Sequence, residues 1–279
     1  MSPDIAEQVE LPDSLLLVGA GKMGGAMLEG WLAKGLEPSR VTVMDPHPSP
    51  ALLDFAGTTG LRLNPESAEI APPEVLVLGI KPQALTEAAA SITPFAGPQT
   101  LVISILAGKT VADLSRALPQ AGAIVRAMPN LPASIGRGAT GAYASPTTTP
   151  RQRALTGALL SAVGLLEWID REDLIDAVTA VSGSGPAYFF HLVEALSAAG
   201  REVGLEPDIA DRLARQTVIG AAELLSGSGL DPAVLRQNVT SPGGTTAAAL
   251  EVLMAKDGMA ALMRRAVEAA KRRAAELSG

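Results

Sequence analysis

Two glycine-containing stretches combine residue types and spacings that suit the binding of anions. The first follows the apolar run LLLV directly and opens a stretch with apolar residues at helical spacing. Glycines spaced as G-x-G-x-x-G allow a tight turn and a close approach of a pyrophosphate to a helix N-terminus. A plain structural turn is the alternative. The motif comprises Gly19, Ala20, Gly21, Lys22, Met23 and Gly24.

An acidic residue stands where such a loop needs one. Asp45 ends the next apolar run, 21 positions after Gly24, which is the spacing of the ribose-binding carboxylate in a Rossmann dinucleotide fold. We therefore predict that residues 19–24 bind a dinucleotide. A carboxylate here accepts hydrogen bonds from the ribose 2′-hydroxyl and repels a 2′-phosphate, for which His47, with Ser49, is the only nearby partner. This favours NADH over NADPH, unless Asp45 turns outward and serves only as a cap.

The second stretch, TSPGGTT at 240–246, precedes a predicted helix. Its paired glycines let consecutive backbone N–H groups converge, and the helix start adds its dipole and free N–H groups. The alternative is an ordinary N-cap, with Ser or Thr as the capping residue and proline in the first turn. The residues alone do not decide between the two. A nest for a carboxylate would consist of Ser241, Gly243, Gly244, Thr245 and Thr246.

Three further candidates lie where predicted strands end. Lys81 closes an apolar run at the carboxyl edge of the predicted sheet, where open α/β folds bind ligands. A strand-end lysine that reaches solvent is the alternative. Ala107 and Gly108 follow the next run at a similar edge, where small residues would let a cofactor approach the backbone.

Apolar, β-rich runs must position these residues, and stretches with helical spacing alternate with them. Each run is almost continuously apolar, as parallel strands buried on both faces are. The alternation predicts βαβ units and a doubly wound parallel sheet. The runs are residues 15–20, 40–45, 74–80, 100–106 and 123–128.

The residue pattern of the chain changes after Trp168: the apolar runs typical of strands end, and long stretches rich in Ala and Leu follow. Gly204 and Pro207 mark the end of one predicted helix and the start of the next. We place a domain boundary near residue 170. The prediction is a Rossmann-type dinucleotide-binding domain at 1–169 and an all-helical domain at 170–279.

Composition excludes several classes of function. The net charge of −7 argues against a nucleic-acid or anionic-membrane surface, and the absence of cysteine excludes thiolate catalysis, disulfides and zinc fingers. The polar start MSPDIAEQVELPDS is not typical of a signal peptide, and no apolar run is long enough to span a membrane. We expect a cytoplasmic protein.

Histidine chemistry is not expected either. His47 lies in the predicted ribose loop, and His191 follows AYFF on an apolar helix, where a packing role is expected. Neither has the spacing of a metal ligand or a catalytic pair.

These motifs together resemble those of the pyrroline-5-carboxylate reductase family along nearly the whole chain. The two most distinctive stretches are DLIDAVTAVSGSGPAYFF (173–190) and NVTSPGGTTAAALEVL (238–253); VGAGKMG, GIKPQ (79–83) and ISILAG (103–108) support them. The resemblance implies reduction of Δ1-pyrroline-5-carboxylate to L-proline by hydride transfer from NADH or NADPH, the last step of proline biosynthesis. It also implies a helical domain that intertwines with its partner in a homodimer or larger homo-oligomer, with the active site between one subunit's Rossmann domain and the partner's helices.

The resemblance assigns roles to further residues. Thr246, the catalytic candidate, would donate a hydrogen bond near the substrate nitrogen, Asn238 would lie at the base of the loop, and Glu172 near the active site. A protonated imine is already electrophilic, so proximity and orientation can supply most of the rate. The cofactor-binding set gains Asn64 on the adenosine side and, against the nicotinamide ribose, Ile80, Lys81 and Pro82.

Two other functions fit the same architecture. One is another imine or β-hydroxyacid reductase, but hydroxyacid enzymes of this shape usually rely on a lysine in the first long helix of the helical domain. That stretch offers His191 and Glu194 and no lysine. The other is a non-catalytic dinucleotide-binding regulator, which a degraded substrate loop would support, whereas TSPGGTT is intact.

Overall fold

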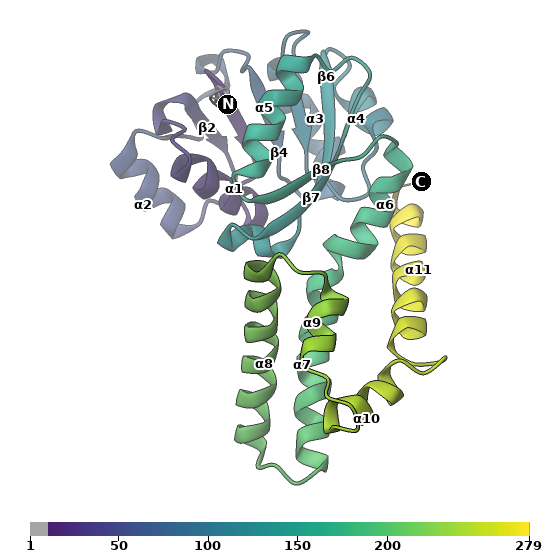
Figure 1. Cartoon of the computed structure of the whole chain (residues 1–279). Helices are drawn as coiled ribbons and strands as arrows, with labels where there is room; N and C mark the ends of the chain where they lie inside the picture. The colour runs from purple at the N-terminus through teal and green to yellow at the C-terminus, as the bar shows by residue number, and fades with distance from the viewer. Residues whose placement is uncertain (1–10, 279) are drawn as a thin grey trace, which may run out of the picture. The chain divides into compact units, whose positions relative to one another are not determined.

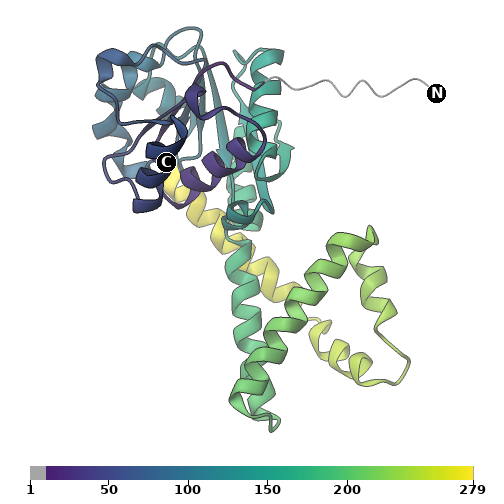
Figure 2. The same cartoon turned by 90° about the vertical axis from the view of Figure 1, so that its left-hand side faces the viewer.

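The computed structural model describes residues 11–278, which fall into two compact units (Figures 1 and 2). The first unit runs to Gly183 and takes in residues from Ala270 onward, and the second comprises Ser184–Ala269. The polar N-terminal segment, for which we expected no signal peptide, lies largely outside the described residues.

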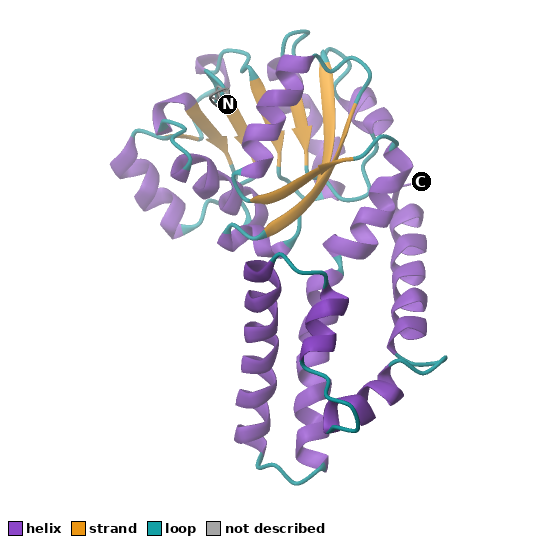
Figure 3. Ribbon diagram, viewed as in Figure 1, coloured by secondary structure: helices purple, strands orange, loops and turns teal. Residues whose placement is uncertain are grey.

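The first unit contains one eight-stranded sheet, with strand order β3-β2-β1-β4-β5-β6-β7-β8 (Figure 3). Neighbouring strands are parallel except for β6 and β7. The order reverses between β1 and β4, the switch point at which open α/β sheets bind ligands. The predicted α/β fold is confirmed. The strands are β1 (Leu15–Val18), β2 (Val41–Met44), β3 (Arg62–Leu63), β4 (Val75–Leu78), β5 (Leu101–Ser104), β6 (Ala123–Met128), β7 (Gly138–Ala144) and β8 (Gly164–Trp168).

Helices cover both faces of this sheet because successive strand residues point to opposite faces. Leu15 and Leu17 of β1 join one hydrophobic cluster, which includes residues of α1, α2 and α5. Leu16 and Val18 join the other, which includes residues of α3 and α4. The covering helices are α1 (Lys22–Ala33), α2 (Pro50–Thr59), α3 (Leu85–Ile92), α4 (Val111–Ala117) and α5 (Pro150–Ser161).

Sequence patterns predict β1, β2, β4, β5 and β6, whereas β3, β7 and β8 are additional. β3 has two residues, and β7 (GATGAYA) is too rich in small residues to show a strand pattern. Those small residues let a helix approach the sheet, since a β-carbon on Gly141 would lie 2.7 Å from the Val178 side chain. β8 is an edge strand that alternates half-buried and exposed residues.

The largest fully buried side chain, Trp31 of α1, anchors the core on one face. Its indole Nε1–H donates to the Leu159 carbonyl of α5 at 2.9 Å. Next to it, a β-carbon on Gly30 would lie 2.6 Å from the Val163 side chain, so glycine allows the two segments to approach closely. Trp31 therefore combines apolar burial with a satisfied polar atom.

The first unit extends beyond the boundary expected near residue 170. The segment comprises η6 (Glu172–Leu174), α6 (Ile175–Val178) and the π-helical turn η7 (Thr179–Gly183), and α6 and η7 pack against β7. Asn130 Nδ2 also donates to the Ser182 carbonyl at 3.0 Å. These contacts explain why the chain divides after Gly183 rather than after Trp168.

The second unit is helical, as expected. The turn between α7 and α8 contains Gly204 at φ +103°, and Pro207 opens α8, as the sequence indicated. The helices are α7 (Gly185–Glu202), α8 (Pro207–Ser228), α9 (Pro232–Asn238), α10 (Thr245–Leu253) and the first part of α11 (Met259–Ser278).

α7 and α8 pack through small residues and one charged contact. Ser197 of α7 and Ala210 of α8 are buried. Asp211 of α8 accepts hydrogen bonds from the Ser197 hydroxyl and from the Arg201 guanidinium. These bonds, that from Ser197 foremost, hold the pKa of the Asp211 carboxyl below its usual value.

Large apolar side chains of the second unit are widely exposed in the single chain. Val203 is 84% exposed, Val252 72% and Phe189 61%. Exposed apolar surface on this scale marks a surface that another molecule covers. The helical unit therefore lacks a closed core of its own.

Replacing Trp31 by Phe should lower the free energy of unfolding by about 2 kcal/mol, because the Leu159 carbonyl loses its donor and a cavity opens. Chemical denaturation at fixed protein concentration measures the change. Trp168→Phe is the matched control, since Trp168 is only half-buried: it packs against the same hydrophobic cluster and stacks under Arg153, at 3.9 Å. Equal losses in the two variants would contradict the role given to Trp31.

Candidate functional site

The glycine loop between β1 and α1 is built around the carbonyl oxygen of Gly19. Gly19 has φ +90°, and a β-carbon on Gly79, at the end of β4, would lie 2.6 Å from that oxygen. A β-carbon on Gly24 would clash with the same oxygen. Gly21 differs from these residues, because a β-carbon there would meet nothing within 4 Å. Packing thus explains Gly19 and Gly24, and Gly21 leaves open space in front of the helix start.

The backbone N–H groups at the start of α1 have no side-chain cap and can bind an anion. Gly21 is the N-cap residue and no side chain caps the helix. The first-turn N–H groups of an uncapped helix are available to a phosphate. Lys22, the first residue of α1, places a cation there.

Asp45 lies beside this loop, as the sequence predicted. Its Oδ2 accepts from the Ala20 N–H at 2.7 Å, and its Oδ1 accepts from the His47 N–H at 2.8 Å. The carboxylate therefore caps backbone groups on both sides. Each carboxylate oxygen can accept a further hydrogen bond, so these contacts do not exclude a ribose hydroxyl.

Asn64 holds the backbone of Asp45. Its Oδ1 accepts from the Asp45 N–H at 2.8 Å and its Nδ2 donates to the Asp45 carbonyl at 2.7 Å. Asn64 is also the only non-glycine residue with positive φ (+48°) among residues 11–278. Asn64, which we expected on the adenosine side, thus has a local role: it shapes the backbone turn that carries the Asp45 carboxylate.

A cavity of about 510 Å³ joins three of the predicted cofactor residues, Asp45, Asn64 and Ile80. Its other walls come from the ends of β1 and β2 and from one side of α3. Lys81 follows Ile80 and is exposed, and Pro82 begins the turn η3 (Pro82–Ala84). The cavity lies at the switch point of the sheet and has the size of a nucleotide-binding cleft.

The loop after β5 is held from two sides. Gly108 has φ +71°, and a β-carbon there would lie 2.8 Å from the Leu277 carbonyl of α11, so packing alone explains this glycine. Thr110 and Asp113 form a capping box at the start of α4. Burial acts to raise the pKa of Asp113, but hydrogen bonds from Thr110 and Arg116 outweigh it and keep that pKa lowered.

Glu172 belongs to this region of the first unit. Its Oε1 accepts from the Val111 N–H at 2.7 Å and lies 3.4 Å from Arg126 Nη1. Residue types alone suggest only a helix-start acid here, and the link to a loop 61 residues away is visible only in the structure.

A second cavity, of about 440 Å³, lies between the start of α1 and the segment after β6, and sequence reasoning missed it. Lys22 and Met23 line one side, and Pro129 and Asn130 the other. The Asn130 side chain is engaged, since Oδ1 accepts from the Ala139 N–H at 2.8 Å. The sequence did contain a signal for this cavity: Pro129 and Asn130 directly follow the apolar run 123–128, at the same sheet edge as the glycine loop.

The TSPGGTT loop joins α9 to α10, in the second unit. The N-cap of α10 is Gly244, and no side chain caps the helix, so the Ser or Thr cap considered as an alternative is not present. Gly243 has φ +70°, and a β-carbon on Gly244 would lie 2.5 Å from Ser241 Oγ. Asn238 ends α9 at the base of the loop, and Thr245 and Thr246 open α10.

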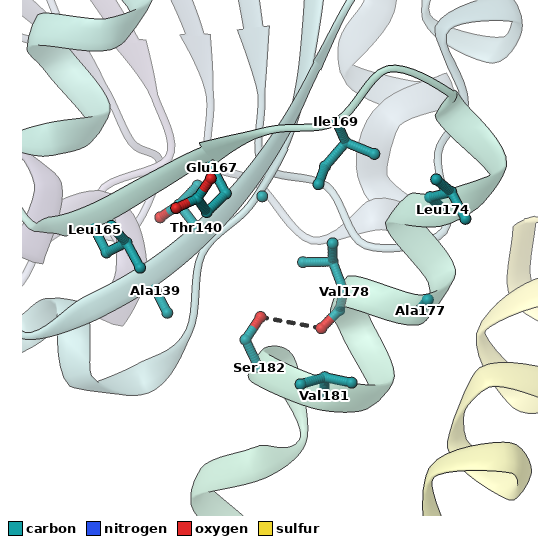
Figure 4. Close-up of a pocket in the computed structure, with 11 residues that line it drawn as sticks. Ala139, Thr140, Leu165, Glu167, Ile169, Leu174, Ala177, Val178, Val181 and Ser182 are labelled. Carbon is teal, nitrogen blue, oxygen red and sulfur yellow. Dashed lines mark hydrogen bonds between the residues drawn. The ribbon is translucent and has the colours of Figure 1, made fainter. Parts of the chain in front are cut away.

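Another cavity, of about 420 Å³, contains none of the predicted site residues (Figure 4). Residues of β7, β8, η6, α6 and η7 form its walls, and most are apolar; the exceptions are Thr140, Glu167 and Ser182. Thr140 Oγ1 in its wall is the one buried side-chain polar atom without a hydrogen-bond partner among residues 11–278. The cavity lacks convergent polar groups and so is unsuited to chemistry.

Histidine and metal chemistry find no support in the described part of the chain. No group of three His, Asp or Glu residues there could hold a metal ion. His191 is exposed and contacts Glu194 at 3.0 Å, so the expected packing role is wrong for the single chain.

No helix within residues 11–278 is long and apolar enough to cross a membrane.

Known proteins match both parts of the chain. Residues 172–277 match the family model described as pyrroline-5-carboxylate reductase dimerisation, and residues 14–108 match one described as NADP oxidoreductase coenzyme F420-dependent. The match to a dimerisation model indicates a homo-oligomer.

Relatives and solved structures cover the whole fold. A pyrroline-5-carboxylate reductase of Pseudomonas aeruginosa is 42% identical to this chain, and the match covers 95% of this chain and 96% of the relative. A pyrroline-5-carboxylate reductase of Synechocystis is 43% identical, and the match covers 94% of this chain and 97% of the relative. The structure of a pyrroline-5-carboxylate reductase from Coxiella burnetii superposes with a TM-score of 0.87 at 36% identity, over 97% of this chain and 100% of that one. The structure of a Plasmodium falciparum pyrroline carboxylate reductase with NADP bound has a TM-score of 0.79 at 26% identity, and the match covers 97% of this chain and 100% of that one. The chain belongs to the pyrroline-5-carboxylate reductase family.

Proposed function

We propose that this chain reduces Δ1-pyrroline-5-carboxylate to L-proline with a reduced nicotinamide dinucleotide. One observation carries the proposal: among the described residues, α1 and α10 each begin in a glycine loop, at Gly21 and at Gly244, and no side chain caps either helix. The first suits a pyrophosphate and the second a carboxylate. Family membership ties this pair of anion sites to an imino acid substrate.

The residues around the glycine loop fit a dinucleotide. A β-carbon at Gly21 would occupy free space at the helix start, and the cavity beside Asp45 and Ile80 continues from the same sheet edge. When bound, the nicotinamide supplies a hydride. Asp45 would face the adenine ribose, with Lys81 and the loop at Ala107 and Gly108 nearer the nicotinamide.

The substrate loop binds through backbone groups. The N–H groups of Thr245 and Thr246 at the start of α10 would hold the substrate carboxylate, with Ser241 beside them. The Gly244 N–H donates to the Ser241 carbonyl at 3.0 Å and so shapes the loop. The Thr246 hydroxyl would donate to the substrate nitrogen. The imine carbon gains the hydride and the nitrogen keeps its proton, so C=N⁺–H becomes CH–NH and no general base is required.

Assembly completes the proposal. The exposed apolar residues of the second unit, such as Phe189 and Val252, would be covered by a second copy in a homodimer or larger homo-oligomer. Asn238 and the substrate loop would then serve an active site formed with the partner's Rossmann domain.

The purified protein should oxidise NADH or NADPH in the presence of Δ1-pyrroline-5-carboxylate, with L-proline as the product. Thr246→Val should lower kcat/KM by about 10²-fold, because a positioned hydrogen-bond donor to the reacting group is lost. Thr245→Val, a matched change one residue earlier, should have a smaller effect. Protein that binds a dinucleotide but leaves Δ1-pyrroline-5-carboxylate unchanged would direct the search to other imines.

Gly21→Ala should raise the Kd for the dinucleotide by about 10-fold or more, because the new methyl group occupies the space of the pyrophosphate. The free energy of unfolding should change by less than about 0.5 kcal/mol, since the β-carbon meets no atom of the chain. Titration of dinucleotide binding and chemical denaturation measure the two effects. Gly57→Ala, an equally unobstructed position in α2, is the control and should leave the Kd unchanged.

The wild-type ratio of kcat/KM for NADH over NADPH should exceed one, because the Asp45 carboxylate repels a 2′-phosphate. Asp45→Asn keeps one hydrogen-bond acceptor and removes the charge, and should reduce this ratio by about 10-fold, as expected from one charge at contact distance. Asp54→Asn, the same charge change at an exposed position of α2, should leave the ratio unchanged. A wild-type preference for NADPH would remove this role of Asp45 and leave the reaction standing.

A further inference from the structure

Arg126 is a buried cation inside the apolar strand β6. Its side chain is 5% exposed and has two acidic partners, Glu172 at 3.4 Å and Asp176 at 3.5 Å. A buried guanidinium is tolerated only when its charge and hydrogen bonds are matched. The packing on this face of β6 does not require a charge, because Ile124, two residues earlier on the same face, is a buried apolar side chain.

One of the two partners connects Arg126 to the loop after β5. Glu172 Oε1 accepts from Arg126 Nη1 and, at 2.7 Å, from the backbone N–H of Val111. Val111 is the first residue of α4, and residues 107–110 precede it directly. The orientation of Glu172 therefore fixes where this loop enters the helix.

The other partner connects Arg126 to the last turn of α11. Asp176 Oδ1 accepts from the Ser278 hydroxyl at 3.3 Å, and Arg126 Nη2 donates to Ser278 Oγ at 3.5 Å. The preceding residue, Leu277, places its carbonyl against Gly108. The same buried cation thus holds both sides of the loop, through Glu172 at one end and the α11 turn at the other.

We propose that Arg126 is a positioning residue for dinucleotide binding: through Glu172 and the Val111 N–H it holds residues 107–110 in the conformation that receives the cofactor. The inference rests on the proposed function, which assigns Ala107 and Gly108 to the cofactor. Arg126 itself is buried and does not contact the ligand. Its effect appears in dinucleotide affinity, because a small displacement of a binding loop weakens every contact that the loop makes.

Dinucleotide binding to the full-length protein tests this role directly. Arg126→Met should raise the Kd for NADH by about 10-fold, with a smaller change in kcat at saturating cofactor. Arg126→Lys restores the charge and should recover part of the affinity. Glu172→Ala should match Arg126→Met, and the double variant should be no worse than either, because both act through one contact. Circular dichroism at the assay temperature establishes that each variant is folded.

Two control variants separate positioning from stability. Asp176→Asn weakens only the α11 side of the loop and leaves the Val111 N–H contact in place, so it should lower Tm and raise the Kd by less than Glu172→Ala does. Arg116→Met removes a cation that is 77% exposed and pairs with Asp113 at 3.0 Å, and should change neither quantity. A Kd that rose in proportion to the loss of Tm across all variants would overturn the proposal.

The remaining outcomes are equally decisive. A folded Arg126→Met protein that binds NADH within twofold of the wild type overturns the inference, and where that variant does not fold, the Kd of Glu172→Ala decides in the same way. Wild-type protein that binds NADH but does not reduce Δ1-pyrroline-5-carboxylate overturns the proposed reaction, while the Kd series still decides the role of Arg126. Wild-type protein that binds neither NADH nor NADPH overturns both.

Discussion

The first unit depends on the surroundings of one carbonyl oxygen, that of Gly19. Gly24 and Gly79 both need to lack a side chain because they approach this oxygen, and Gly19 needs its positive φ to present it. This close contact places the start of α1 over the ends of β1 and β4, at the switch point of the sheet. The open space at Gly21 and the cavity beside Asp45 follow from that placement.

Asp45 has a structural role that is compatible with the recognition proposed for it. The sequence left open whether it binds a ribose or only caps the chain, and the contacts with Ala20 and His47 establish the capping role. Asn64 then fixes the backbone from which the carboxylate projects. A carboxylate held so rigidly loses little entropy when it accepts one more hydrogen bond, so capping favours recognition rather than competing with it.

Much of this arrangement could be predicted from the sequence, because its signals are local. Continuously apolar runs predicted the parallel strands, and the family and α/β fold are confirmed. β7 was missed because close helix packing selects small residues, which have no strand signature. Long-range contacts were missed because a local sequence does not show its distant partner: nothing near Gly108 indicates Leu277, and nothing near Glu172 indicates Val111. Arg126 within AIVRAM was the available signal, since a charge in an apolar strand needs partners from elsewhere. The assigned roles of the site residues and the cytoplasmic location stay predictions.

The two units solve different physical problems. The sheet buries its strands under helices on both faces, and its ligand site is set by backbone contacts that persist in the single chain. The helical unit leaves large apolar side chains exposed, so its folding free energy is coupled to association. The loop proposed to bind the substrate nevertheless offers only backbone N–H groups and hydroxyls, none of which titrates near neutral pH. An enzyme that reduces a preformed cation needs no tuned acid or base, and its rate then depends on how firmly such fixed dipoles hold the substrate. In the proposed assembly, covering the apolar faces of the loop's helices would restrain the loop as well and so hold these dipoles in place.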